Sequence, residues 1–213
     1  ALGQTGIMVA GGMESMTEAP YLLPQMRGGA RIGHGQVLDH MFLDGLEDAY
    51  DKGRLMGTFA EDCAGHYQFT REAQDEYALA SLTNALNAQS SGAFDAEIAT
   101  HVIHGRKGET RVTADEQPAK ARPDKIPTLK PAFRKDGTVT AANASSISDG
   151  AAALVMASRT AAEAADAPIR AFVRGHASHA QEPGWFTTAP VPAARKLLER
   201  LGWGVDDVDL WEV

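Results

Sequence analysis

The sequence predicts an α/β fold with a mostly parallel sheet. Two short apolar runs, at residues 7–10 and 151–157, have the length and composition of buried strands, and a tight turn is expected at Gly11-Gly12 after the first. Over the last fifty residues, a strand pattern at 169–173, an amphipathic helix that ends before Gly202 and a strand pattern at 205–213 follow one another. That order is typical of a βαβ unit, and hence of parallel strands.

Two helices are predicted by their start signals in the first half of the chain. Thr58 stands three residues before Glu61, the capping-box spacing at which each side chain bonds the other residue's amide. Thr70, followed by the acidic Glu72, opens a longer pattern of apolar residues that Gly92 can end. We therefore expect one helix to begin at each threonine.

Composition excludes several classes of protein. The 213 residues are 44% hydrophobic, which is enough for one or two folded domains. The net charge of −8 provides no overall positive field for a nucleic acid, and the longest apolar run, residues 151–157, is too short to cross a membrane. A single cysteine, Cys63, fits a reducing compartment. We therefore expect a cytoplasmic protein that binds neither nucleic acid nor membrane.

Candidate reactive and binding groups are few. Cys63 shares a helix face with Ala60 and Tyr67, so a small core residue is expected there rather than a nucleophile. The seven histidines lack metal-ligand spacing, and no metal site is expected. Residues 101–136 carry nine Lys or Arg against five Asp or Glu. This basic, proline-rich segment is either a solvated surface or a site for an anionic small molecule such as a nucleotide phosphate.

The segment at residues 137–150 is the most informative part of the chain. A short strand at 139–141 is expected, followed by a loop of small polar residues. Small side chains let a ligand approach the backbone closely, and Asn143, Ser145 and Ser146 offer hydrogen bonds there. The segment is therefore either the edge of a ligand site or a tight loop packed under a helix.

Several motifs, in a consistent order, resemble those of the thiolases. Together they extend over essentially the whole chain. Within the family, the sequence resembles the acetyl-CoA acetyltransferase (thiolase II-like) branch. The matching segments are Val9–Met16, Ala19–Tyr21, Met56–Glu61, Arg71–Asp75, Tyr77–Ser81, Gly92–Phe94, Glu97–Ile98, Leu129–Phe133, Gly137–Ala153 and Asp209–Val213. An ordered set of this kind is far more specific than any one of its motifs.

The resemblance implies the thiolase fold, an α/β architecture of five layers (αβαβα) with an inserted α+β loop domain. The sequence would be an internal fragment of that fold. Residues 1–19 and 131–158 would belong to the N-terminal half, 20–130 to the loop domain, which binds CoA and makes tetramer contacts, and 165–213 to the start of the C-terminal half. The Gly-rich stretch at 27–35 falls where those tetramer contacts are expected, so a homotetramer is implied, with a dimer as the alternative.

The activity that the resemblance implies is that of an acetyl-CoA C-acetyltransferase in fatty acid metabolism. Such an enzyme condenses two acetyl-CoA molecules to acetoacetyl-CoA, or cleaves a 3-ketoacyl-CoA by thiolysis. Coenzyme A and acetyl-CoA are then substrates, and no permanently bound cofactor is expected. The family's nucleophilic cysteine would precede Ala1, and its histidine and second cysteine would follow Val213. No catalytic residue is thus expected within this chain, and the chain alone should be inactive. The alternative is a non-catalytic thiolase-like protein that binds acyl-CoA or lipid, or acts as a scaffold.

Six residues of this chain match CoA-binding positions of the family. Ser145 would contact the pantetheine, with Ala144 beside it in the same loop. The remaining four would form apolar surface along the cofactor or near the acyl pocket: Leu46, Leu55, Met56 and Phe133. Leu55 stands where biosynthetic relatives often have a histidine, and its apolar side chain makes an acyl group longer than acetyl conceivable.

Overall fold

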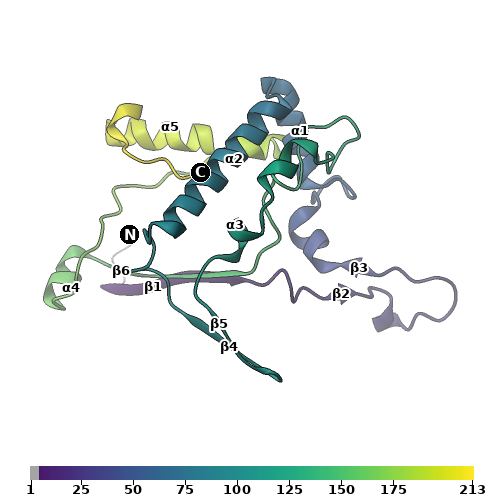
Figure 1. Ribbon diagram of the computed structural model, residues 1–213, viewed down its shortest axis with the longest axis horizontal. Coiled ribbons are helices and arrows are strands. Elements are labelled where there is room, and N and C mark those ends of the chain that lie inside the picture. The colour runs from purple at the N-terminus through teal and green to yellow at the C-terminus, as the bar shows by residue number, and fades with distance from the viewer. Residues whose placement is uncertain (1–4) are drawn as a thin grey trace. The chain divides into compact units, whose positions relative to one another are not determined.

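The computed structural model describes residues 5–213, which divide into two structural units (Figure 1). The first combines the chain up to Phe59 with Ser146–Val213, and the second is Ala60–Ser145. The boundary falls inside α1 (Met56–Tyr67), so this helix contributes residues to both units. The predicted assignment of segments to thiolase halves and a loop domain uses other boundaries and stays a prediction.

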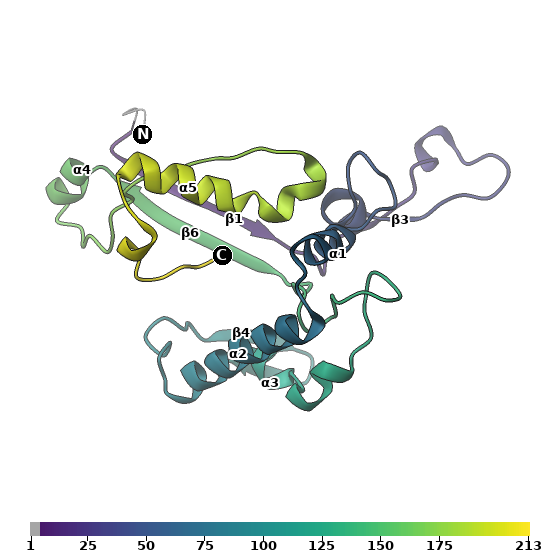
Figure 2. The same cartoon turned by 90° about the horizontal axis from the view of Figure 1, so that it is seen from above.

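The two predicted apolar strands pair with each other in the first unit. β1 (Ile7–Glu14) runs antiparallel to β6 (Gly150–Ala157), with Gly11 opposite Ala153 (Figure 2). β1 continues through Gly11-Gly12, so the turn predicted there is wrong. A Cβ atom at Gly11 would overlap the backbone carbonyl of Ala152, and glycine therefore lets the strands pair through this point.

Side chains on both strands remain largely exposed. The exposed fraction is 70% for Val9 and 76% for Val155, and every residue of β6 is classed as exposed. Within residues 5–213, β1 and β6 form a sheet of two strands only. A sheet of that size is marginally stable in water unless further strands or a helix pack on it. The burial that the sequence predicts for these strands is therefore not achieved by the described part of the chain.

The Gly-rich stretch at 27–35 lies in an exposed excursion of the chain. β2 (Tyr21–Leu22) pairs antiparallel with β3 (Leu38–Asp39), and all residues from 23 to 37 between them are exposed. The side chain of Ile32, near the middle of the excursion, is 98% exposed. A π-helical turn at Phe42–Leu46 follows β3.

α4 (Arg159–Ala164) and α5 (Pro190–Leu201) are the helices near the end of the first unit. Gly202 ends α5 in the left-handed conformation, with φ 68°, as the sequence predicts. The strand patterns on either side of α5 do not form strands, since residues 169–173 have no regular structure and Val205–Asp207 is a 3₁₀ turn.

The predicted βαβ unit is therefore wrong for residues 5–213, and so is the mostly parallel sheet, because the strand pairs described there are all antiparallel. An apolar stretch becomes a strand only where a neighbouring strand bonds its backbone and covers its side chains. Neither segment has such a neighbour in the described part of the chain.

The second unit is built on α2 (Arg71–Ser90), which follows α1 after a short link. The Thr70 hydroxyl accepts a hydrogen bond from the Ala73 amide at 3.1 Å, and Gly92 beyond the helix has φ 72°, so both predicted end signals are confirmed. The hairpin of β4 (His101–Gly105) and β5 (Gly108–Val112) comes next, then α3 (Glu116–Lys120) and a 3₁₀ helix at Pro123–Thr128. Of the helices in residues 5–213, none is both long and apolar enough to span a membrane.

The predicted capping box at Thr58 does not form. α1 begins at Met56, two residues earlier, and the Thr58 hydroxyl donates to the carbonyl of Leu55 at 2.7 Å. The Glu61 carboxylate, in a residue that is only 6% exposed, binds the loop instead. It accepts hydrogen bonds from the amides of Thr138 and Val139, each at 2.9 Å for the shorter contact, and from the Thr138 hydroxyl at 3.1 Å.

This contact explains why the strand predicted at 139–141 is absent. The amides of Thr138 and Val139 are bonded to a side chain of α1, so they do not pair with a neighbouring strand. Gly137, just before them, lies so close to Glu61 that a Cβ atom there would overlap Oε1. The loop is therefore shaped by a carboxylate rather than by a sheet.

We predict that Glu61→Gln lowers the free energy of unfolding by about 1–3 kcal/mol, because an amide group then faces several buried donors and supplies one acceptor fewer. Urea unfolding at neutral pH measures the change. Glu76→Gln, at an exposed position on α2, is the matched control and should have little effect. Equal stability of the two variants would contradict the role of Glu61.

We also predict that the free energy of unfolding of Asp149→Asn falls less steeply at acidic pH than that of the unsubstituted protein. The hydrogen bond from the amide nitrogen of Thr17 to Oδ1, at 2.9 Å, lowers the pKa of Asp149 from its ordinary value of 3.8. A lowered folded-state pKa contributes stability that is complete above the unfolded-state value and is lost as the pH falls through the folded-state value. Urea unfolding between about pH 6 and pH 2 tests this, with Asp209→Asn, at an exposed position, as the control. Parallel curves for Asp149→Asn and the unsubstituted protein would sink the prediction.

Candidate functional site

A hollow of about 650 Å³ lies in the second unit. One wall is a face of α2, where Ala78, Leu82 and Ala85 recur at helical spacing. A second wall is the 3₁₀ helix at Pro123–Thr128 and the residue after it, and a third is the loop at Ala141-Ala142. The volume lies within the range of sites that bind small molecules and cofactors.

Two cations stand at this hollow. Arg122 and Lys125, both exposed, line it and belong to the basic segment that the sequence singles out. Asp115 also lines it, but its carboxylate accepts the Gln117 amide at 2.9 Å and caps α3. The local charge therefore favours an anionic ligand, the second of the two interpretations of the basic segment.

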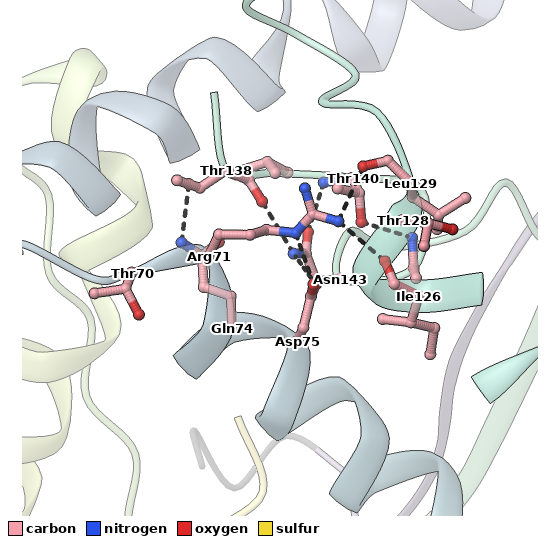
Figure 3. A network of polar contacts seen from close by, with 12 residues as sticks. Thr70, Arg71, Gln74, Asp75, Ile126, Thr128, Leu129, Thr138, Thr140 and Asn143 are labelled. Atoms are coloured by element: carbon pink, nitrogen blue, oxygen red, sulfur yellow. Dashed lines mark hydrogen bonds and ion pairs between the residues drawn. The ribbon is translucent and has the colours of Figure 1, made fainter. Parts of the chain in front are cut away.

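Behind the hollow, a polar network connects its walls (Figure 3). Asp75 on α2 is 5% exposed, and its Oδ2 accepts a hydrogen bond from Nε of Arg71 at 2.7 Å. Nη2 of Arg71 donates in turn to the carbonyls of Ile126 and Leu129, both at 3.0 Å. One ion pair on α2 thus binds the backbone of the second wall, some fifty residues away in the sequence.

The same carboxylate also holds the third wall through Asn143. Nδ2 of Asn143 donates to Oδ1 of Asp75 and to the Thr138 carbonyl, each at 3.1 Å. Oδ1 of Asn143 accepts the amide of Thr140, a fully buried residue, at 2.7 Å. Asn143 was expected to offer its hydrogen bonds to a ligand. Both ends of its amide bond protein atoms instead, so its role is to shape the loop.

The other predicted contacts of the second unit lie near this loop but outside the lining of the hollow. Ser145 is exposed, and Ala144 before it is half-buried. Phe133 is also half-buried and lies in a turn shortly after the second wall. The exposed hydroxyl of Ser145 is accessible for a hydrogen bond to a ligand.

The three predicted contacts of the first unit are brought close together by a local bridge. Leu46 ends the π-helical turn, and the next residue, Glu47, pairs with Leu55 in an antiparallel bridge, directly before Met56 at the start of α1. All three predicted contacts are half-buried. The intervening turn is closed by Asp48, whose carboxylate accepts the amides of Asp51 at 2.6 Å and Tyr50 at 2.8 Å. These bonds, the one from Asp51 above all, lower the pKa of Asp48.

Phe59, one turn further along α1, anchors this region. It is 3% exposed, and its ring contacts that of Phe186 edge-on with the centroids 6.0 Å apart. The guanidinium of Arg54 lies over the same ring at 3.8 Å from its centroid. The start of α1 is therefore held between an aromatic and a cationic side chain.

Candidate catalytic and metal groups remain sparse in the structure. Cys63 is half-buried within α1. Over residues 5–213, no three His, Cys, Asp or Glu side chains gather closely enough to hold a metal ion. The hollow is lined mainly by small and apolar side chains, together with Arg122 and Lys125.

Sequence reasoning missed the residues that shape the hollow, Arg71, Asp75 and Glu61. One signal was present: Arg71 and Asp75 are four residues apart, the spacing of an ion pair on one helix face. Asp75 also lies three and seven residues before Ala78 and Leu82, on the face that lines the hollow. A charge on the apolar side of a helix indicates a buried, partnered group.

Comparison with known proteins identifies the family of this chain. The family model for the thiolase N-terminal domain matches residues 1–160. The chain is 44% identical to a probable acetyl-CoA acetyltransferase of Dictyostelium discoideum and 46% identical to an acetyl-CoA acetyltransferase of Rhizobium meliloti (strain 1021), in both cases over 100% of this chain. These alignments cover 51% and 54% of the two relatives, so the chain spans about half the length of the curated relatives it matches.

Solved structures give the same result. The acetyl-CoA acetyltransferase from Syntrophomonas wolfei superposes with a TM-score of 0.92 at 41% identity, over 99% of this chain and 53% of that one. The Bacillus anthracis acetyl-CoA acetyltransferase superposes with a TM-score of 0.90 at 41% identity, over 98% of this chain and 53% of that one. The fold is that of the thiolases, and the chain belongs to the thiolase family.

Proposed function

We propose that the protein, in its full natural length, is an acetyl-CoA C-acetyltransferase and that the described chain carries its CoA-binding surface. In thiolysis, the bond between C2 and C3 of a 3-ketoacyl-CoA breaks and a new thioester bond joins the C3 acyl group to the sulfur of free CoA. The C2 carbon takes up the proton that the thiol loses and leaves as acetyl-CoA. Condensation of two acetyl-CoA molecules is the reverse reaction.

The observation that carries the proposal is the hollow of the second unit, in a chain of this family. Coenzyme A has an adenosine with several phosphate charges and a long, largely uncharged pantetheine arm. Arg122 and Lys125 supply positive charge at the hollow, and Ala141-Ala142 have no side-chain atoms beyond Cβ to obstruct a ligand. The combination suits an anionic nucleotide bound against backbone.

The chemical character of the six predicted contacts suits the parts of CoA that they are proposed to touch. Ser145 offers an exposed hydroxyl to the amide groups of the pantetheine arm. Leu46, Leu55 and Met56, gathered at the bridge before α1, are proposed as apolar surface for the acyl end, with Phe133 and Ala144 along the arm. Leu55 extends the apolar surface, so acyl groups longer than acetyl belong within the proposed substrate range.

Catalytic groups are proposed to lie outside residues 5–213, because Cys63, half-buried within α1, is poorly placed as a nucleophile. A cytoplasmic location and a homotetramer, or a dimer, are also part of the proposal. The exposed excursion between β2 and β3, with Ile32 near its middle, is the segment proposed to contact another subunit.

We predict that the full-length protein cleaves acetoacetyl-CoA in the presence of free CoA. The loss of absorbance of the enolate form of the substrate follows the reaction, and a longer 3-ketoacyl-CoA tests the chain-length range. Omission of CoA is the control and should abolish turnover, because no acceptor thiol is present. Tight binding of CoA without turnover of any 3-ketoacyl-CoA would favour the non-catalytic alternative, an acyl-CoA or lipid binder or a scaffold.

We further predict that Ser145→Ala weakens CoA binding about fivefold, the equivalent of about 1 kcal/mol for one neutral hydrogen bond. Isothermal titration of the full-length protein with CoA measures the dissociation constant. Ser146→Ala is the matched control, because the neighbouring hydroxyl pairs with that of Ser148 at 2.9 Å. An unchanged dissociation constant for Ser145→Ala would remove Ser145 from the proposed contacts.

A further inference from the structure

Asp75 connects the three walls of the hollow through its hydrogen bonds. It belongs to α2, the first wall, and it is one of the few buried charged residues of the described chain. Its two carboxylate oxygens bind different partners, Oδ2 the guanidinium of Arg71 and Oδ1 the amide of Asn143. Each partner then contacts a different wall (Figure 3).

Arg71 connects the carboxylate to the second wall. Its side chain is only 19% exposed, and its Nη2 donates to the carbonyls of Ile126 and Leu129, which lie at the end of the 3₁₀ helix. The Ile126 carbonyl also accepts the amide of Leu129 at 3.2 Å, and the guanidinium adds a charged donor at this end of the helix. Both residues line the hollow, so the position of this wall depends on where the guanidinium is held.

Asn143 connects the same carboxylate to the third wall. Its side chain bonds the backbone of Thr138 on one side and of Thr140 on the other, and the Thr140 hydroxyl accepts the amide of Ala142 at 3.2 Å. Ala141-Ala142 therefore form a turn whose shape is set by buried side chains rather than by secondary structure. The ligand side of that turn carries only methyl groups.

We propose that Asp75 is the positioning residue of the CoA site: it touches no part of CoA but fixes the distance between the walls that do. This inference rests on the proposed function, because it takes CoA as the occupant of the hollow. A buried carboxylate with two charged or polar partners holds them in one geometry, and a site with walls set in advance loses less entropy when the ligand binds. Without the charge, Arg71 loses its ion-pair partner. The second and third walls are then no longer fixed in position relative to α2.

The test is Asp75→Asn in the full-length protein, a substitution that keeps the shape and removes the charge. One NH₂ group then faces a donor on Arg71 or Asn143. We expect about a tenfold rise in the dissociation constant of CoA, the effect of one charge-assisted hydrogen bond. The KM for CoA should rise by a similar factor in acetoacetyl-CoA thiolysis. The kcat should stay within about twofold, because the groups that react with the substrate are proposed to lie elsewhere.

Thr70→Ala is the matched control. It removes the N-cap of the same helix and so destabilises α2, but the Thr70 hydroxyl bonds only the first turn of the helix and no wall of the hollow. Its CoA affinity and KM should stay within about twofold of the unsubstituted protein, because the first turn of α2, which Thr70 caps, lies before the α2 residues that line the hollow. If Thr70→Ala weakens CoA binding as much as Asp75→Asn does, the effect is one of helix stability and the inference is overturned.

A second variant decides the matter if Asp75→Asn does not fold. Arg71→Lys keeps the charge beside Asp75, but an ammonium group cannot bond the carboxylate and both carbonyls with the geometry of a guanidinium. It should raise the dissociation constant of CoA severalfold with kcat retained, and an unchanged constant would overturn the inference. Absence of CoA binding by the unsubstituted protein would overturn the proposed function itself. Normal binding by that protein and equal binding by Asp75→Asn would overturn only the role of Asp75.

Discussion

The second unit depends on one constraint: the backbone of a buried loop must find hydrogen-bond partners without forming a strand or a helix. Residues 138–143 have no ladder of their own, and Val139 and Thr140 are buried. Buried amides that lack partners cost folding free energy, so side chains must supply the acceptors. Glu61 binds the amides of Thr138 and Val139, and Asn143 binds that of Thr140.

The buried charges of the second unit hold the backbone in place. Glu61 and Asp75, the latter paired with the largely buried Arg71, hold the loop and the neighbouring 3₁₀ helix against α1 and α2. The exposed cations Arg122 and Lys125 line the hollow. The buried negative charges are already partnered, so the positive charges at the surface remain the ones that a phosphate-bearing ligand would meet. An acidic protein can in this way present a locally basic site.

Strong local signals in the sequence were enough to predict part of this structure. The ends of α2 and α5 were predictable, because Thr70 and Gly202 satisfy or terminate a helix through atoms only a few residues away. The strand at 151–157 was predictable from its run of apolar residues, although its partner strand lies more than a hundred residues earlier in the sequence. The family was predictable as well, since ten ordered motifs are spread over the chain, and the match to residues 1–160 confirms it.

Tertiary contacts decided the rest. Glu61 has the spacing of a capping residue, yet it bonds a loop 77 and 78 residues further on, an arrangement that no local pattern encodes. The strand patterns at 169–173 and 205–213 have the required composition but lack a neighbouring strand in the described part of the chain. Ser145 could be selected from the sequence because a motif surrounds it. The role of Asp75 could not be read from its motif, because that role comes from Asn143, 68 residues further on, and from the bonds of Arg71 to Ile126 and Leu129, 55 and 58 residues beyond Arg71. Local order follows from neighbours in the sequence, whereas the shape of the hollow follows from neighbours in space.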